Sequence, residues 1–374
     1  MQFEQKLTQY RELIAQKLPT FDLEQLEVFT GAQSGYRMRA EFAIYHQNQP
    51  SYSVHHVVHD SVTKQRIFCE GKYAIANALI NRLMPAVEEF FAQNYKFAHK
   101  LFQIEYLTTT TQQVVISLLF HRALDKSEEN NVDLLHAQAF KDFLQTKLNL
   151  KTEDLHIILR AKKTKLQLGN NFISETLHVN DKEFALYQVE NSFSQPNAEI
   201  NNLMLSYVDK HVHTDHDILE LYCGVGNFTV VLASCGKKLL ATEVNKQAVD
   251  FVYRNLERNN LTNVQVGRIS AEEFVQAINK VRPFKRLEHI DLDTYNFDTV
   301  FVDPPRAGLD TASCDMISQF ANIIYVSCNP HTLVDNLQYL TSKYGYRIKQ
   351  LALFDQFPQT PHCESIAILT KNHS

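Results

Sequence analysis

The chain has 374 residues, 44% of them hydrophobic, and a formal net charge of −5 at pH 7. This length can bury a full core and suggests two domains. The negative charge argues against a generally basic nucleic-acid binder, although positive charge is concentrated locally at Arg160, Lys162, Lys163 and Lys165. No run approaches the roughly 18 apolar residues of a membrane span, and residues 1–18 carry charges every few positions, as in an amphipathic helix. We therefore expect a soluble, cytoplasmic protein.

The cysteines are spread along the chain without a CxxC pair, so neither a metal site nor an iron-sulfur cluster is predicted. In a reducing compartment they should be free thiols. They are Cys69, Cys223, Cys235, Cys314, Cys328 and Cys363.

The first part of the chain, residues 1–180, mixes β-type runs with helical stretches. Helices are predicted near residues 74–91 and 133–147, and the polar residues 125–131 read as a surface loop. The β-type runs are RAEFAIYH, YSVHHVVH and QQVVISLLFH. This pattern predicts an α+β domain with its boundary near Asn180.

From Asp217 onward, short apolar runs alternate with helical patterns that begin at Asn227 and Lys246. Such alternation is typical of parallel strands joined by crossover helices. The runs are DILELY, KLLATE, NVQVG, TVFVD and IIYVSC, followed by YRIKQLALFDQF and SIAILTK without a helix between them. Residues 181–374 are therefore predicted to form an α/β, Rossmann-like domain with a seven-stranded, doubly wound sheet ending in a hairpin.

A glycine turn follows the first of these strands. Gly224 and Gly226 allow the backbone to approach a ligand, and Glu243 ends the next strand, where a carboxylate can accept hydrogen bonds from ribose hydroxyls. Thr229 stands in place of a third glycine and there is no phosphate-binding lysine, which favours a nucleoside cofactor without a pyrophosphate, such as S-adenosylmethionine. The alternative is a plain tight turn, with Glu243 a solvated residue at a helix start.

Two further strands carry reactive groups to the carboxyl edge, where open α/β sheets bind ligands. The first ends in Asp303-Pro304-Pro305-Arg306, and Arg306 takes the place where many amino methyltransferases have an aromatic residue that stacks on the target base. The second delivers Cys328, just before the predicted helix start at Pro330. Local positive potential and helix amides are expected to lower the pKa of this thiol. A buried, inert cysteine is the alternative.

A proline-rich tail loop holds His362 and Glu364, either of which could act as a general base. A thiol, a methyl donor and a base at one edge would suit methylation of a carbon that is a poor nucleophile, such as carbon 5 of uracil: a thiolate adds to carbon 6, the donor gives its methyl group, and the base removes the carbon 5 proton. Cys328, the cofactor and Glu364 fill these roles. Cys363, beside the proposed base, is a second candidate nucleophile.

These motifs closely resemble the tRNA (uracil-5-)-methyltransferase family. The resemblance implies that Gln195, Tyr222, Asn227, Glu243 and Asp303 contact S-adenosylmethionine, that Cys328 is the nucleophile and that Glu364 accepts the proton. The matching segments are NSFSQPN, ELYCGVGNF, ATE, FVDPPRAGLD, YVSCNPHTL and ALFDQFPQTPHCE, with YRMRAEF and KLFQIEYLT in the first half.

The resemblance also implies that the substrate is the T-arm of tRNA, and it leaves open whether the similar arm of tmRNA is used. The enzyme should extrude the uridine from its stack and replace the lost contacts. Arg37, Arg39, Phe102 and His121 of the first domain are candidates for this RNA contact, although Phe102 also fits a core position. We expect a monomer.

Three alternatives remain. A ribosomal RNA 5-methyluridine methyltransferase would carry an N-terminal cysteine cluster, whereas only Cys69 precedes Cys223 here. A cytosine carbon 5 methyltransferase would place a Pro-Cys near the strand that ends in Asp303. An RNA chaperone on a methyltransferase fold would not need Cys328 and Glu364 together.

Overall fold

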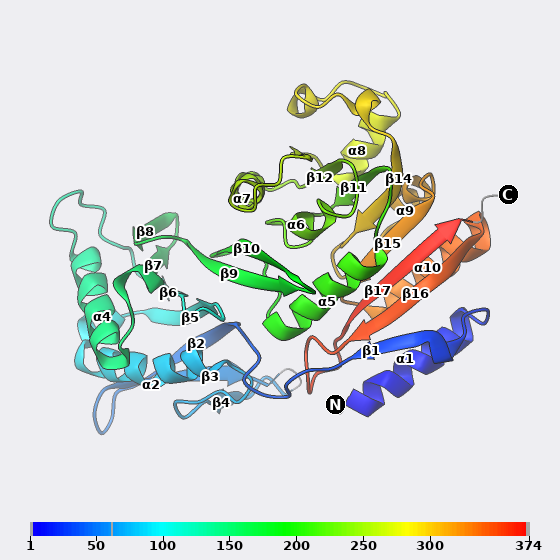
Figure 1. Ribbon diagram of the computed structural model, residues 1–374. Coiled ribbons are helices and arrows are strands. Elements are labelled where there is room, and N and C mark those ends of the chain that lie inside the picture. The colour runs from blue at the N-terminus through cyan, green and yellow to red at the C-terminus, as the bar shows by residue number, and fades with distance from the viewer. Residues whose placement is uncertain (1–2, 61–62, 372–374) are drawn as a thin grey trace. The chain divides into compact units, whose positions relative to one another are not determined.

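The computed structural model describes residues 3–60 and 63–371, and the chain folds into two compact units (Figure 1). The first unit combines Met1–Ala32, Thr176–Leu186 and Glu199–Ser374. The second unit combines Gln33–Glu175 and Tyr187–Ala198. Each unit therefore draws on segments that lie far apart in the sequence.

The described residues of the first unit form an eight-stranded sheet in the order β1-β16-β17-β15-β14-β11-β12-β13. All neighbouring strands are parallel except β17, which runs antiparallel to both β15 and β16. The strand order reverses between β11 and β14, which is the switch point at which such sheets bind ligands. The strands are β1 (Leu26–Phe29), β11 (Asp217–Leu221), β12 (Leu239–Thr242), β13 (Val264–Gly267), β14 (Phe297–Val302), β15 (Asn322–Ser327), β16 (Tyr346–Phe354) and β17 (Glu364–Lys371).

Both faces of this sheet are buried, which explains why its strands read as continuous apolar runs. Along β16, Leu351 and Leu353 join one hydrophobic cluster, while Ala352 and Phe354 join another on the opposite face. The helices are α1 (Phe3–Lys17), α5 (Ala198–His211), α6 (Thr229–Leu232), α7 (Lys246–Arg258), α8 (Ala271–Ile278), α9 (Thr311–Ile317) and α10 (Pro330–Tyr344). The predicted doubly wound α/β fold is therefore confirmed.

Local sequence signals explain where the helices of this unit begin and end. Asn245 caps α7 by accepting from the Ala248 amide, and Ser270 forms a capping box with Glu273 at α8. α10 has Pro330 in its first turn and stops at Gly345, whose φ of 70° suits glycine.

The second unit contains a seven-stranded sheet in the order β4-β3-β2-β5-β6-β7-β8. Helices α2 (Ala78–Gln93) and α4 (Val132–Leu148) pack together on one face and share a single hydrophobic cluster with it (Figure 1). The strands are β2 (Arg39–Gln47), β3 (Ser53–His59), β4 (Arg66–Phe68), β5 (Leu101–Thr108), β6 (Val114–Phe120), β7 (Leu155–Ala161) and β8 (Thr164–Leu168), and a short α3 (Tyr95–Ala98) precedes β5. Both helices fall where the sequence predicts them.

The division of the chain differs from the predicted split near Asn180 because the first 32 residues belong to the sheet of the first unit. There β1 pairs in parallel with β16, with Leu26 opposite Leu351, and α1 packs on α10. The sheet consequently has one strand more than the predicted seven. A hairpin of β9 (Phe172–Val179) and β10 (Lys182–Val189) contributes residues to both units.

Candidate active site

Cys328 and Glu364 lie at adjoining ends of two neighbouring strands. Ser327, the last residue of β15, is paired with Ser365 of β17 in antiparallel register. One step further along each chain therefore brings Cys328 against Glu364, which begins β17. Because β17 is antiparallel, its first residue reaches the edge at which the parallel strands end. The predicted nucleophile and the predicted base thus share one end of the sheet.

The same edge carries four residues predicted to hold the cofactor. Tyr222 follows β11, Glu243 follows β12 and Asp303 follows β14, because Leu221 is paired with both Thr242 and Val302. Gly224 lies in the turn after Tyr222 and donates its amide to Glu243 Oε2 over 3.1 Å. The glycine turn and the strand register together explain why Gly224 and Glu243 are in contact.

The turn after β11 fits a nucleoside ligand. Tyr222, Gly224 and Gly226 all have positive φ, and a Cβ at Gly224 would meet open space. Glu243 is half-buried, and its Oε1 accepts the amides of Val244 and Asn245, both over 2.8 Å. The carboxylate is thus fixed beside an open glycine, as ribose recognition requires.

Asn227, also predicted to contact the cofactor, exchanges amide hydrogen bonds with Asn201 of α5 at 2.9 and 3.0 Å. Gln195 belongs to the second unit, where it is buried in the segment between β10 and α5. The resemblance predicts that Gln195 and Asn227 both bind the cofactor. In the structure Gln195 belongs to the second unit and Asn227 to the first.

Burial dominates the electrostatics at the sheet edge. Glu364 is 2% exposed, and burial and the charge of Asp303 raise its pKa well above the ordinary value. Burial also raises the pKa of Asp303 to about 7. Burial therefore raises the proton affinity of both carboxyl groups.

The Cys328 thiol is half-buried, and its pKa is raised to about 11 by burial and by the charges of Glu364 and Asp303. The Arg306 guanidinium acts in the opposite direction. The predicted lowering of this pKa is therefore wrong for the chain by itself. Burial and the charges of two carboxylates outweigh one guanidinium.

Arg306 is held near Cys328 by two loops. Its Nη2 lies 2.8 and 3.0 Å from the ring nitrogens of His362, and its carbonyl oxygen accepts from Asn329 Nδ2 over 3.1 Å. Asn329 is the neighbour of Cys328 and caps α10. The loops after β14, β15 and β16 are thereby linked through side chains.

A pocket of about 320 Å³ opens beside Cys328. Arg306, His331 and His362 line it from the sheet edge, and Gln9 and Leu13 line it from α1. Helix α1 was not predicted to join the site. The sequence of an amphipathic helix shows that one face is buried but does not show which part of the protein that face packs against.

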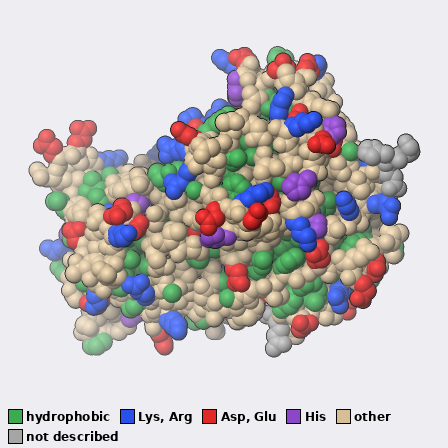
Figure 2. All heavy atoms as spheres, in the orientation of Figure 1, with side chains coloured by type: hydrophobic (Ala, Val, Ile, Leu, Met, Phe, Trp, Pro, Cys, Tyr) green, Lys and Arg blue, Asp and Glu red, His purple; other side chains and the backbone are tan. Residues whose placement is uncertain are grey.

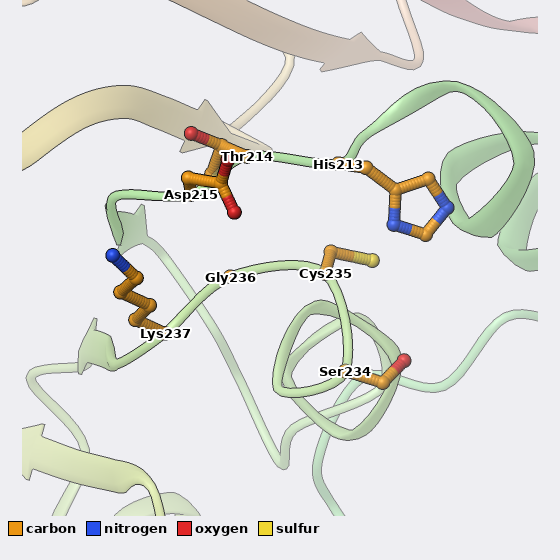
Figure 3. A pocket seen from close by; sticks show the side chains of 7 residues that line it. All are labelled: His213, Thr214, Asp215, Ser234, Cys235, Gly236 and Lys237. Atoms are coloured by element: carbon orange, nitrogen blue, oxygen red, sulfur yellow. The ribbon is translucent and has the colours of Figure 1, made fainter.

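Two other features do not join this group. Cys363 is 2% exposed and burial raises its pKa to about 12, which disfavours it as a second nucleophile. A separate hollow is formed by residues 213–215, before β11, and residues 234–237, after α6 (Figure 3). It lies at the amino end of β11, whereas Tyr222 follows the carboxyl end.

Two of the predicted RNA contacts stack on each other in the second unit. The rings of Phe102 and His121 are parallel within 10°, with centroids 3.8 Å apart. Phe102 is half-buried and lines a pocket of about 580 Å³ that also includes His46, Tyr52 and Tyr95; we call this the Phe102 pocket. The core position that was the alternative for Phe102 is excluded.

The predicted arginines are engaged within the same unit. Arg37 Nε donates to the Arg39 carbonyl over 2.7 Å, and Arg39 donates to the Ser192 carbonyl. Of the local basic cluster, Arg160 and Lys165 form ion pairs with Glu190. Figure 2 shows positive and negative side chains interspersed over the face in view, in keeping with the net charge of −5. Among the described residues, no helix is long and apolar enough to cross a membrane.

Comparisons with known proteins agree over nearly the whole chain. Residues 2–372 match the family described as tRNA (Uracil-5-)-methyltransferase. Curated proteins named tRNA/tmRNA (uracil-C(5))-methyltransferase are 42% identical in a Shewanella species (strain MR-4) and in Erwinia tasmaniensis, each covering 99% of this chain and 97% of its own. The fold is similar to the crystal structure of Pyrococcus abyssi tRNA (uracil-54, C5)-methyltransferase with S-adenosyl-L-homocysteine, at a TM-score of 0.68 and 21% identity, over 99% of this chain and 84% of that one. This chain therefore belongs to the tRNA (uracil-5-)-methyltransferase family of S-adenosylmethionine-dependent enzymes.

Proposed function

We propose that the protein methylates carbon 5 of the T-loop uridine at position 54 of tRNA through a covalent bond between Cys328 and carbon 6 of uracil, and that it acts as a monomer. The observation that carries this proposal is the register of β15 and β17, which sets Cys328 against Glu364. Within the described part of the chain, Cys328 is the one cysteine that is not fully buried. The names of the relatives support tRNA as the substrate and the similar arm of tmRNA as a second one.

In this proposal Cys328 releases its proton to water through the pocket beside it, and the thiolate adds to carbon 6, which makes carbon 5 nucleophilic. Bound S-adenosylmethionine would supply the electrophilic methyl group and leave as S-adenosylhomocysteine. Glu364 then takes the proton from carbon 5, and the Cys328 sulfur leaves as the double bond re-forms. A carboxyl group with a raised pKa is suited to this step because it holds the proton strongly.

The cofactor is assigned to residues at the ends of β11, β12 and β14, and the resemblance to the family adds Gln195. Glu243 would accept the ribose hydroxyls, and the open backbone at Gly224 would allow the nucleoside to approach. The full set is Gln195, Tyr222, Gly224, Asn227, Glu243 and Asp303.

The second unit is assigned the role of holding RNA. Extrusion of the uridine costs a few kcal/mol, and stacking on an aromatic face offsets part of that cost. The stacked pair of Phe102 and His121 offers such a face, and Arg37 and Arg39 are assigned to the RNA backbone.

One incubation tests the activity and the covalent step together. The protein is incubated with cofactor labelled in its methyl group and with unmodified tRNA, and the nucleosides are analysed. We expect labelled 5-methyluridine at position 54. A parallel reaction uses tRNA containing 5-fluorouridine, which has no carbon 5 proton to release, so a labelled RNA–protein band should survive denaturation. Label in 5-methylcytidine or in no nucleoside would overturn the proposal.

A further inference from the structure

Lys6 of the N-terminal helix is buried beside the catalytic edge. Its side chain is 2% exposed, and its ammonium group forms an ion pair with Asp355, which is fully buried, over 2.6 Å. A lysine on an amphipathic helix ordinarily keeps its charge in water. This one lies against the loop of residues 355–363, which connects β16 to β17.

The ammonium group has three hydrogen-bond donors, and all three find partners in this loop. Besides Asp355, Lys6 Nζ donates to the carbonyl oxygens of Phe357, over 2.8 Å, and His362, over 3.0 Å. Asp355 is the first residue after β16, and His362 lies two residues before Glu364. One side chain therefore joins the beginning of the loop to its end.

The held end of the loop carries the groups that act on Cys328. Glu364 follows His362 by two residues, and the His362 ring contacts Arg306. The Arg306 guanidinium opposes the rise in the pKa of both Cys328 and Glu364. A shift of the His362 backbone would therefore move Glu364.

From these contacts we infer that Lys6 is a positioning residue of the active site: it fixes the loop of residues 355–363 so that Glu364 stays in place to remove the carbon 5 proton. The inference rests on the proposed function, because it assigns Lys6 to the release of product from the covalent intermediate. Formation of that intermediate needs Cys328 and not Glu364. Loss of Lys6 should therefore slow release more than addition.

The test is the variant Lys6→Met, with Lys17→Met as its matched control. Lys17 lies on the same helix and forms an ion pair with Asp335 of α10, but both side chains are partly exposed and neither belongs to the loop. The control removes an equal charge from α1 without releasing the loop. Thermal unfolding of each variant establishes that it is folded.

Two substrates separate the two steps. With 5-fluorouridine tRNA, the Lys6→Met enzyme should form the denaturation-resistant band at a rate within about threefold of the unaltered enzyme. With ordinary tRNA, release of 5-methyluridine should slow on the order of 10- to 100-fold, as expected for a small misplacement of a reacting group. The methylated RNA–protein band should then accumulate, and Lys17→Met should show neither effect. Equal slowing of both steps, or no slowing of release, would overturn the inference.

A second variant covers the case in which Lys6→Met does not fold, since it leaves Asp355 buried without its cation. The double variant Lys6→Met/Asp355→Leu replaces the buried pair by apolar side chains and should recover the unfolding temperature. It cannot recover the bonds to Phe357 and His362, so release should remain slow. If this folded variant releases product at the unaltered rate, Lys6 only neutralises the charge of Asp355, and the positioning role is refuted. If the unaltered enzyme forms no band with 5-fluorouridine tRNA, the covalent mechanism itself fails.

Discussion

The carboxyl edge of the eight-stranded sheet and the Phe102 pocket of the second unit differ in the burial and chemistry of their side chains. At the sheet edge, Glu364 is 2% exposed and burial raises the pKa of both Glu364 and Cys328. In the Phe102 pocket, the ring of Tyr95 is 59% exposed and the Phe102 and His121 rings stack where ring faces can be reached. Breaking and forming bonds depends on proton affinities that burial can change, whereas holding RNA depends on ring faces that a base can reach.

The largest expected effect separates chemistry from binding. Cys328→Ala should lower methyl transfer by roughly 10⁴-fold or more, because the variant lacks the proposed nucleophile. Cofactor affinity, measured by calorimetry, should stay within about twofold. Near-normal turnover would exclude Cys328 from the mechanism. The sheet edge would then no longer differ from the Phe102 pocket as the place where bonds are made and broken.

Glu364→Gln tests the order of events at the sheet edge. Glutamine keeps the shape but accepts no proton, so the reaction should stop with methylated uridine still joined to Cys328. Gel electrophoresis after denaturation should show an RNA-linked band carrying label from the cofactor methyl. The band should vanish in the Glu364→Gln/Cys328→Ala double variant, and free 5-methyluridine produced at the normal rate without a band would exclude Glu364 as the base.

Phe102→Ala moves the test to the second unit. Loss of one stacking ring should raise KM for tRNA by about tenfold, within the roughly 1 to 3 kcal/mol of a base stack, while kcat changes by less than about twofold. Phe68→Ala is the control, because Phe68 is also an exposed ring of this unit but does not line the pocket. A fall in kcat with unchanged KM would assign Phe102 to the chemistry instead.

The smallest effect concerns the pH dependence of stability. Glu220 on β11 is 1% exposed, and burial raises its pKa to about 8 from 4.5. Between these two values the native state holds a proton that the unfolded chain has released, so the free energy of unfolding falls as pH rises. Glu220→Gln should flatten this decline by up to about 1.4 kcal/mol per pH unit, the value for one proton.

Denaturant unfolding from pH 4.5 to 8 measures that slope. Glu257→Gln is the matched control, because Glu257 is exposed on α7 of the same unit and should leave the slope unchanged. An unchanged slope in Glu220→Gln would mean that Glu220 is ionised in the folded protein.

Much of the catalytic edge could be predicted because its residues follow strands directly. Parallel strands end at one edge, so Glu243, Asp303 and Cys328 had to lie along the same edge of the sheet once the strands were identified. The start of α7 at Lys246 was predicted correctly, and Asn245 before it is a favoured cap. These features depend on local pattern and on the geometry of a parallel sheet.

Other features were decided by contacts between distant parts of the chain. The sequence alone determined the α/β class, the strand ends and the residue types at the edge. Only the tertiary structure joined β1 to β16 and placed Lys6 beside Asp355, 349 residues away. It also reversed the expected shift in the pKa of Cys328, because burial and two neighbouring carboxylates outweigh one guanidinium. Proton affinity depends on surroundings assembled from several strands and loops, and no short stretch of sequence specifies them.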